Sequence, residues 1–282
     1  MRAHEMYLRP TDLSEALGAL AGGAMTVLAG GTDFYPARVG RAVSEPVLDI
    51  SAVAALRGVR EDASHIRIGA LTTWSELIAH RLPAYCDGLK LAAREVGGAQ
   101  IQNAGTVAGN ICNASPAADG IPPLLALDAQ VELASASGTR RVALEGFVRG
   151  NRRTACGPAE LVTAVLVPKW GPAARATFLK LGSRRYMVIS IVMVAATLEV
   201  DAEGILTRAA LAVGACSEVA QRLPVLEARL LGQPLSSALA ALARPKDLEA
   251  LAPISDVRGT GAYRRDAALT LVRRALAALG GE

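Results

Sequence analysis

The sequence predicts an α+β protein built from two small α/β units and a third unit of antiparallel sheet and helices. Three observations lead to this fold class. Strand-like and helix-like segments alternate through residues 1–170. Beyond them, two long apolar strands are joined by a short polar turn, and the chain ends in an amphipathic helix. A length of 282 residues is enough for two or three compact units with a sizeable core.

The first unit, residues 1–54, opens with a helix. Thr11 and Asp12 are candidate caps, apolar residues recur at helical spacing in "LSEALGAL", and Gly22-Gly23 ends the pattern. A short strand runs directly into the sequence "GGTD", and "FYPARV" then looks like the first turn of a second helix. The strands of this unit are expected at residues 25–29 and 47–50.

The second unit, residues 55–170, begins at a strand over residues 65–68. Thr72 or Thr73 caps the helix that follows, with Glu76 in the capping-box position. "GLKLAAREVGG" reads as another helix, and "DAQVELASASGTRRVAL" as a hairpin, because apolar residues alternate with polar ones and Ser137-Gly138 supplies a turn. Prolines and a glycine in "VLVPKWGPAA" mark the boundary.

The third unit, residues 171–282, opens with "FLKLGSRR". The strands "MVAATLEV" and "ILTRAALAV" are joined by "DAEG" and form a second hairpin, and two helical stretches follow. The closing helix, "YRRDAALTLVRRALAAL", keeps its arginines off its apolar face. That face comprises Ala268, Leu271, Val272, Ala275 and Leu279.

Composition describes a globular protein, with 51% hydrophobic and 20% charged residues. The longest nearly apolar run, Val188 to Leu198, is far shorter than the roughly 20 residues that span a bilayer. The N-terminal sequence "MRAHEMYLRP" lacks the apolar core of a signal peptide. We therefore expect a cytoplasmic protein without a membrane span.

A nucleic-acid partner is not expected. The net charge of +4 is small for this length, and the arginines are scattered as pairs instead of forming a basic stripe. Only 4% of residues are aromatic, which leaves few side chains for stacking on bases.

The four cysteines form no CxxC pair, so neither a zinc site nor an iron–sulfur loop is indicated. Free, buried thiols are expected instead. They are Cys86, Cys112, Cys156 and Cys216.

The sequence "AGGTD", residues 29–33, indicates a place where the backbone meets a ligand. Residues without a Cβ can turn successive N–H groups toward one point, and such a concavity binds phosphate oxygens. Thr32 would add a hydroxyl donor, whereas the Asp33 carboxylate would repel phosphate and is expected to cap the next helix. A tight turn without a ligand explains the same glycines.

A second stretch, "NAGTVAGNICNASPAAD" over residues 103–119, is expected to be irregular because it is dense in Gly, Asn, Ser and Pro. Gly105 and Gly109 would again let the backbone approach a ligand. The alternative is a long surface loop shaped by Asx turns.

The polar side chains of this stretch suit a dinucleotide. Thr106 and Asn110 are neutral donors for a diphosphate, while Ser115 and Asp119 combine donors and acceptors for ribityl hydroxyls or a ring imide. Two glycine-rich stretches in one chain therefore predict a dinucleotide bound at both ends.

Other nucleotide folds do not fit. The nearest match to GxGxxG, "GTGAYR", has Arg264 in place of the third glycine and follows no buried strand. The sequence contains no GxxxxGK[ST] motif, and no Ser-His-Asp arrangement stands out.

Taken together, "AGGTD" and "TVAGNICNASPAAD" resemble the paired FAD-binding motifs of the medium subunit of molybdenum hydroxylases, the xanthine dehydrogenase and carbon monoxide dehydrogenase group. The resemblance extends over nearly the whole chain, through "YLRPTDLSEAL", "EVGGAQIQNAGTVAGN", "ALEGFVRGNRRT" and "ISDVRGTGAYRRDAALTLVRRAL". It implies a PCMH-type FAD-binding fold of two α/β subdomains, followed by the C-terminal domain of this flavoprotein type.

The resemblance also implies which residues bind the cofactor, none of them catalytic or metal-binding. Ala29, Gly30, Gly31, Thr32 and Asp33 would line the FAD diphosphate, and Thr106, Gly109, Asn110, Ser115 and Asp119 would hold the rest. Lys180 matches a lysine that in some relatives lies near the flavin ring, where a cation favours the reduced, anionic form; the alternative is a solvated strand lysine. Two positions depart from the family pattern: Ala108 replaces a glycine, and Val188 replaces an acid.

The function implied is that of an oxidoreductase subunit. Its noncovalently bound FAD would take electrons from two [2Fe-2S] clusters of a small partner chain, in a complex whose large chain carries a molybdenum-pterin, and pass them to an external acceptor. A dimer of heterotrimers is compatible with this arrangement. Two alternatives are a stand-alone flavin-dependent oxidoreductase of related fold and a flavin-free scaffold subunit.

Overall fold

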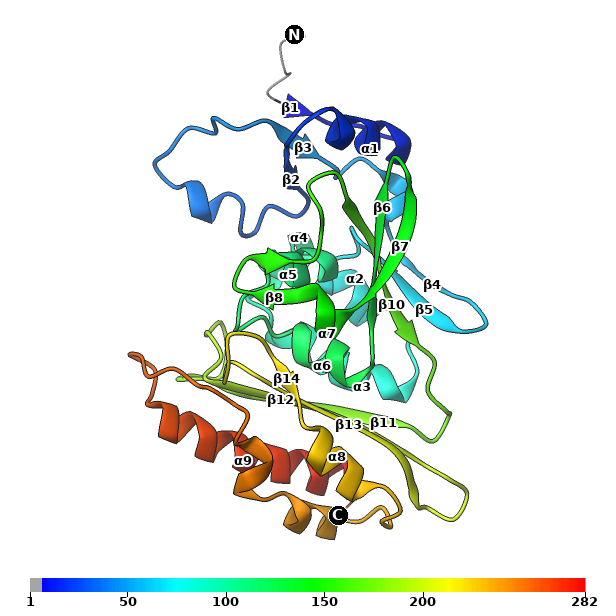
Figure 1. Cartoon of the computed structure of the whole chain (residues 1–282), viewed down its shortest axis with the longest axis vertical. Helices are drawn as coiled ribbons and strands as arrows, with labels where there is room; N and C mark the ends of the chain where they lie inside the picture. The colour runs from blue at the N-terminus through cyan, green and yellow to red at the C-terminus, as the bar shows by residue number, and fades with distance from the viewer. Residues whose placement is uncertain (1–6, 282) are drawn as a thin grey trace.

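The computed structural model describes residues 7–281 and places three sheets one after another along the molecule in chain order (Figure 1). The predicted α+β class is confirmed. Residues 1–6 of the predicted first unit and Glu282 lie outside the described residues. Within residues 7–281, no helix is both long and apolar enough to cross a membrane.

The first sheet is small, parallel and ordered β1-β3-β2. Its strands are β1 (Tyr7–Leu8), β2 (Thr26–Leu28) and β3 (Val47–Asp49). Helix α1 (Leu13–Gly22) begins at the Asp12 cap, whose carboxylate accepts from the N–H groups of Ser14 and Glu15. The predicted helix and both predicted strands are confirmed.

The second helix predicted for this unit is wrong. After "GGTD" the chain makes one 3-10 turn, η1 (Pro36–Arg38), and continues as an exposed loop. Tyr35 precedes this turn without a side-chain cap, so Asp33 caps nothing here. Residues 39–45 contribute no apolar face to the core, so tertiary packing does not extend the turn into a helix.

The second sheet is antiparallel and ordered β4-β5-β10-β6-β7. Its strands are β4 (Val59–Glu61), β5 (His65–Gly69), β6 (Gln130–Ser135), β7 (Gly138–Ala143) and β10 (Leu161–Pro168). The predicted strand and hairpin are confirmed, and the hairpin buries Val131 and Leu133 on one face. A separate pair, β8 (Val148–Gly150) and β9 (Arg153–Thr154), follows the sheet's hairpin.

Eight short helices lie in residues 54–147, some packed on this sheet and others on the third. They are η2 (Ala54–Leu56), α2 (Trp74–Ala79), η3 (Ala84–Cys86), α3 (Asp87–Glu95), α4 (Ala99–Ala104), α5 (Val107–Asn113), α6 (Ile121–Ala126) and α7 (Leu144–Phe147). Thr73 caps α2 in the predicted capping box with Glu76. The irregular loop predicted for residues 103–119 is wrong for residues 107–113, because they form α5, which buries Val107 and Ile111. Residues 114–119 are irregular as predicted, and Ala114 adopts the left-handed conformation at the end of the helix.

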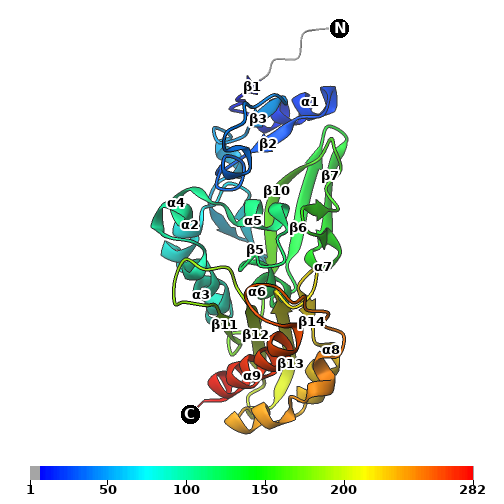
Figure 2. The same cartoon turned by 90° about the vertical axis from the view of Figure 1, so that its left-hand side faces the viewer.

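The third sheet is antiparallel and ordered β11-β12-β13-β14. Its strands are β11 (Arg175–Leu181), β12 (Val192–Val200), β13 (Leu206–Gly214) and β14 (Gln221–Arg222). Helices α3 and α6 contact one face, whereas α8 (Pro224–Leu230) and α9 (Gly261–Gly280) contact the other (Figures 1 and 2). The predicted hairpin through "DAEG" is confirmed.

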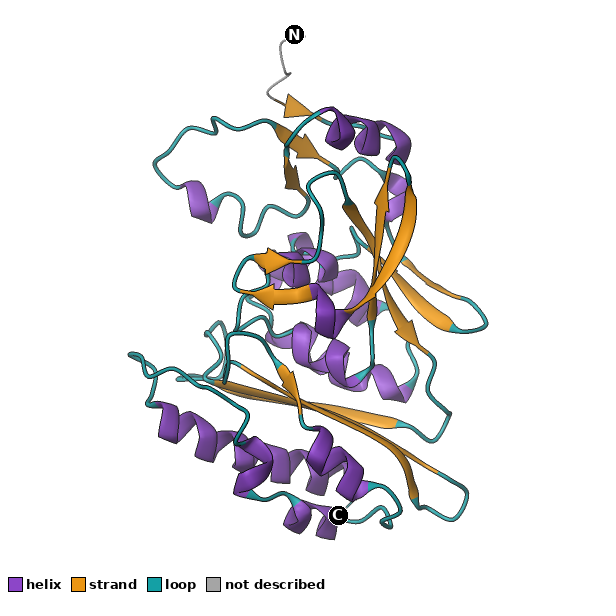
Figure 3. Cartoon of the chain, in the orientation of Figure 1, coloured by secondary structure: helices purple, strands orange, loops and turns teal. Residues whose placement is uncertain are grey.

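Both faces of the third sheet are therefore buried. Along β12, Met193 and Ala195 belong to the core shared with the first two units, while Val192 and Val194 belong to a second core beneath α9. All five residues predicted for the apolar face of α9 lie in that second core. Two short 3-10 helices, η4 (Ser237–Leu242) and η5 (Pro245–Leu248), complete the outer helical layer (Figure 3).

One hydrophobic core spans the first two units, since Ala16 and Leu48 belong to the same cluster as Val131 and Val165. The same cluster takes in the inner face of the third sheet. The division of the chain at residues 54 and 170 stays a prediction.

Candidate functional site

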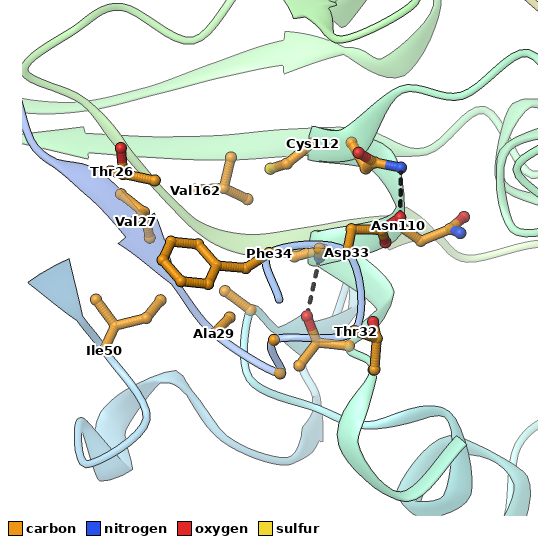
Figure 4. A pocket seen from close by; sticks show the side chains of 18 of the residues that line it. Thr26, Val27, Ala29, Thr32, Asp33, Phe34, Ile50, Asn110, Cys112 and Val162 are labelled. Atoms are coloured by element: carbon orange, nitrogen blue, oxygen red, sulfur yellow. Dashed lines mark hydrogen bonds between the residues drawn. The ribbon is translucent and has the colours of Figure 1, made fainter. Parts of the chain in front are cut away.

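A cavity of about 580 Å³ brings together the two glycine-rich stretches. Its size is within the range of about 300–1,000 Å³ that is usual for small-molecule sites. The 29–33 loop forms one wall, and Thr106, Gly109 and Asn110 contribute to the other. The ring of Phe34 and the side chains of Val27 and Val162 add apolar surface (Figure 4).

Different structural constraints require glycine at the two positions of the 29–33 loop. A Cβ on Gly30 would lie 1.9 Å from the carbonyl oxygen of Ala104, so the loop packs directly on the end of α4. Gly31 has φ = +74°, and a Cβ there would also lie 2.6 Å from Cε2 of Tyr35. The tight turn anticipated as an alternative is therefore present, and it holds the loop's backbone along the cavity.

Thr106 connects the second stretch to helix α5. Its side chain caps the helix by accepting a hydrogen bond of 2.9 Å from the N–H of Gly109. Thr106 is buried, and its hydroxyl group can still donate one hydrogen bond. Thr106 thus stabilises the wall of the cavity as well as lining it.

Two amide side chains fix the neighbouring surface. The Oδ1 atom of Asn110 accepts from the N–H of Gly120 at 3.2 Å, which leaves its NH₂ group as a donor. Asn113 donates from Nδ2 to Oδ1 of Asp33, also at 3.2 Å. Asp33 therefore links the 29–33 loop to α5, in place of the helix-capping role that the sequence predicted.

The remaining predicted residues lie outside the cavity wall. Lys180 forms an ion pair of 2.8 Å with Asp119, and Ser190 donates to the other carboxylate oxygen of Asp119 at 2.6 Å. Lys180 also donates to the carbonyl oxygen of Glu95. Ser115 uses its hydroxyl to accept from the N–H of Ala117.

The alternative of a solvated lysine is wrong, because the side chain of Lys180 is 6% exposed and that of Asp119 is 9% exposed. Burial raises the pKa of Asp119, and the nearby Lys180 cation and the hydrogen bond from Ser190 act in the opposite direction. The pair joins the second unit to strand β11 of the third.

Several lining residues were not predicted. Arg38 stacks on the ring of Phe34, with its Cζ atom 3.8 Å from the ring centroid. Arg152 reaches the cavity from the β8–β9 turn. The sequence "FVRGNRRT" contains Arg152, but neither its spacing nor its chemistry distinguishes this arginine from its neighbours.

The four cysteines are free, as predicted. Cys86 and Cys216 are buried, but Cys156 is half-buried and Cys112 is exposed, so the expectation of buried thiols is wrong for Cys112. Cys112 and Cys156 both line the cavity, which explains why neither is enclosed in a core. Burial raises the pKa of Cys156 to about 11, so its thiol is neutral at pH 7. Among the described residues, no three His, Cys, Asp or Glu side chains are grouped as metal ligands.

Comparison with known proteins accounts for nearly the whole chain. A family described as "FAD binding domain in molybdopterin dehydrogenase" matches residues 2–170, and one described as "CO dehydrogenase flavoprotein C-terminal domain" matches residues 177–279. The chain is 31% identical to the nicotinate dehydrogenase FAD-subunit of Eubacterium barkeri, covering 82% of this chain and 80% of that protein. It is 32% identical to the 6-hydroxypseudooxynicotine dehydrogenase complex subunit alpha of Paenarthrobacter nicotinovorans, covering 96% and 93%.

Solved structures agree with the sequence comparison. A chain of the carbon monoxide dehydrogenase from Hydrogenophaga pseudoflava, in a form that lacks the Mo-pyranopterin moiety of its cofactor, superimposes with a TM-score of 0.87 at 27% identity. The match covers 98% of this chain and 97% of that one.

Proposed function

Since the chain belongs to the family of FAD-binding medium subunits of molybdenum hydroxylases, we propose that it binds one FAD noncovalently and serves as an electron-transfer subunit. The observation that carries this proposal is that the 29–33 loop and the residues around α5 line one cavity together. These two segments lie more than 70 residues apart in the chain and supply most of the donors that the sequence assigned to FAD.

The residues present fit such a cofactor. Gly31, in its left-handed conformation, allows the turn that holds the loop along the cavity, and Thr32 and Asn110 offer neutral donors. Apolar side chains such as Val27 and Val162 suit a flat ring. We assign Ala29, Gly30, Gly31, Thr32 and Asp33 to the diphosphate, with Thr106, Gly109 and Asn110 on the facing wall.

Ser115, Asp119 and Lys180 are assigned to the flavin end of the cofactor. This assignment rests on the family resemblance, and the ion pair between Lys180 and Asp119 fixes both groups at the junction of the second and third units. Lys180 donates to both Asp119 and a backbone carbonyl, so its ammonium group is held in one place.

When bound, FAD would supply electron transfer between the [2Fe-2S] clusters of a small partner chain and an external acceptor. A large partner chain would carry the molybdenum-pterin and oxidise the substrate, and the complex would act in the cytoplasm. The described residues of this chain contain no grouping of metal ligands, which supports placing these centres in partner chains.

The test is the cofactor content of the purified complex. We expect one FAD for each copy of this chain, released into the supernatant when the protein is precipitated with acid. Flavin that stays with the precipitated chain would contradict noncovalent binding, and a complex without flavin would support a scaffold role instead.

A second test separates this subunit from a stand-alone flavoenzyme. The isolated chain should show no turnover with N-heterocycles, aldehydes or carbon monoxide, whereas the reconstituted complex should reduce an artificial acceptor with the complex's own substrate. Steady substrate oxidation by the isolated chain would overturn the proposal.

A further inference from the structure

Arg152 occupies the turn between β8 and β9 in a conformation that is unusual for its type. Its φ of +56° lies in the left-handed region, which costs a residue with a Cβ about 1 kcal/mol relative to its usual conformations. Glycine or asparagine is commoner at such turns. The residue lines the cavity, and its side chain is exposed.

The charges around the cavity leave this arginine uncompensated. The other lining cation, Arg38, is bound to Glu45, with Nε 2.7 Å from Oε1. Of the two lining carboxylates, Glu160 is bound by Arg140 through two hydrogen bonds of 2.5 and 2.7 Å, and Asp33 accepts a hydrogen bond of 3.2 Å from Asn113. Across residues 7–281, Arg152 forms no ion pair and no side-chain hydrogen bond.

We propose that Arg152 is a cofactor-binding residue that contacts the diphosphate of FAD from the turn between β8 and β9. This inference rests on the proposed function, because it takes FAD as the occupant of the cavity. It adds a formal positive charge at the diphosphate end of the site, where the other assigned donors are neutral hydroxyl, amide and backbone groups.

The chemistry of arginine favours this assignment. A guanidinium group remains ionised at all physiological pH values and can donate two parallel hydrogen bonds to phosphate oxygens. The Arg152 cation would also offset the negative charge that the Asp33 carboxylate places near a bound diphosphate. Backbone strain of this kind is commonly retained where a side chain must face a ligand.

The adjacent residue, Arg153, provides a matched control. It is the first residue of β9, forms an ion pair of 2.6 Å with Glu218, and does not line the cavity. Arg153→Gln and Arg152→Gln therefore remove the same charge from neighbouring positions. Arg152→Gly removes the side chain and also relieves the left-handed strain.

The experiment measures dissociation constants of the full-length apo-protein for FAD, for ADP, which carries the same diphosphate, and for riboflavin, which carries no phosphate. We expect Arg152→Gln and Arg152→Gly to weaken FAD and ADP by about tenfold or more and to leave riboflavin unchanged. Arg152→Lys should recover part of the affinity, and Arg153→Gln should match the wild type. Arg152→Gly should unfold at the same temperature as the wild type or a higher one, which shows that lost binding is not lost folding.

Unchanged ADP affinity in both Arg152 variants, with wild-type FAD binding intact, would overturn this inference and leave the proposed function standing. An equal loss of FAD, ADP and riboflavin would also overturn it, since a general distortion would then explain the result. A wild-type chain that binds neither FAD nor ADP would overturn the inference and the proposed function together.

Discussion

Lys180 and Asp119 form an ion pair across the junction of the second and third units, with Nζ and Oδ2 2.8 Å apart and neither side chain more than a tenth exposed. Ser190 donates a hydrogen bond to the Asp119 carboxylate, and Lys180 donates one to the carbonyl oxygen of Glu95. Each charge is therefore tolerated in the interior because the other is present.

Removing one member of this pair should be costly. We expect Asp119→Ala to destabilise the folded chain by about 3–5 kcal/mol, because the Lys180 ammonium is left buried without a counter-charge. The double variant Asp119→Ala/Lys180→Ala should recover a large part of that loss. Urea unfolding of the single and double variants measures both effects.

An exposed pair serves as the control for this cycle. Lys169 and Glu61 are 2.7 Å apart, but their side chains are 34% and 57% exposed. Glu61→Ala should cost about 1 kcal/mol or less. If Asp119→Ala costs no more than Glu61→Ala, burial is not what makes the first pair important. In the proposed complex, Asp119→Ala should still allow substrate to bleach the absorbance of the partner's iron–sulfur clusters, while acceptor reduction falls because FAD is lost or misplaced.

Gly31→Val should lower the FAD content of the folded complex. The substitution adds a Cβ at φ = +74°, 2.6 Å from the ring of Tyr35, and so displaces the loop that lines the cavity. FAD per folded complex and the unfolding temperature are measured together.

Gly40→Val is the matched control, because Gly40 has nearly the same φ of +73° but has no atom within 4 Å of a built Cβ. It should carry the conformational cost alone and keep its FAD. Equal FAD content in the two variants would show that the contact between residue 31 and Tyr35 does not matter for binding.

Thr106→Ala should lower both stability and FAD affinity. Loss of the cap on α5 costs about 1 kcal/mol, and the hydroxyl that lines the cavity is removed as well. Thr73→Ala removes an equivalent cap from α2, with the same bond to the third N–H of the helix, at a position that does not line the cavity. Thermal unfolding should therefore change similarly for both, whereas FAD titration should separate them. Similar FAD affinity in the two variants would show that Thr106 acts only as the cap of α5.

The Asp256 carboxylate should make a contribution to folding stability that depends on pH. The N–H of Arg258, together with Arg264, lowers the pKa of this carboxyl to about 2 from its ordinary value of 3.8. Because the folded-state pKa is the lower one, the stabilisation is complete above the ordinary value and is lost as the pH falls from about 4 toward about 2.

Asp256→Asn tests this contribution by removing the anion bound to the buried guanidinium of Arg264. The wild type should unfold at higher urea than the variant near pH 7, and the two midpoints should converge as the pH falls below about 4. A gap that stays constant with pH would show that the carboxylate charge is not responsible.

Local patterns predicted much of this fold. Asp12 and Thr73 cap helices where expected, since capping requires only neighbouring residues. Both hairpins were found because period-two alternation and turn residues lie within one short stretch. Helix α5 was missed because its glycine and asparagines disfavour a helix, while burial of its apolar residues against distant strands stabilises it.

The site was only partly accessible to sequence reasoning. The two glycine-rich stretches are brought to one cavity, as their chemistry suggested, but the reason for Gly30 lies in its contact with Ala104, 74 residues away. The pairing of Lys180 with Asp119 likewise depends on how the third sheet meets the second unit. Such contacts leave no local pattern in the sequence.

The burial of the third sheet on both faces limits the order in which a newly made chain can finish folding. Its inner face presents Phe178, Met193, Ala195, Ala210 and Ala212 to the core of the preceding units. Helices α3 and α6 pack on the third sheet, so they have no partner until strands β12 and β13 have been synthesised. Until then, apolar side chains of the N-terminal part stay exposed to solvent. A gene fragment for residues 171–282 would have the opposite difficulty, because its sheet would display that same face and invite self-association. Production of this protein in the laboratory therefore calls for the undivided reading frame, even though its sequence families divide near residue 170.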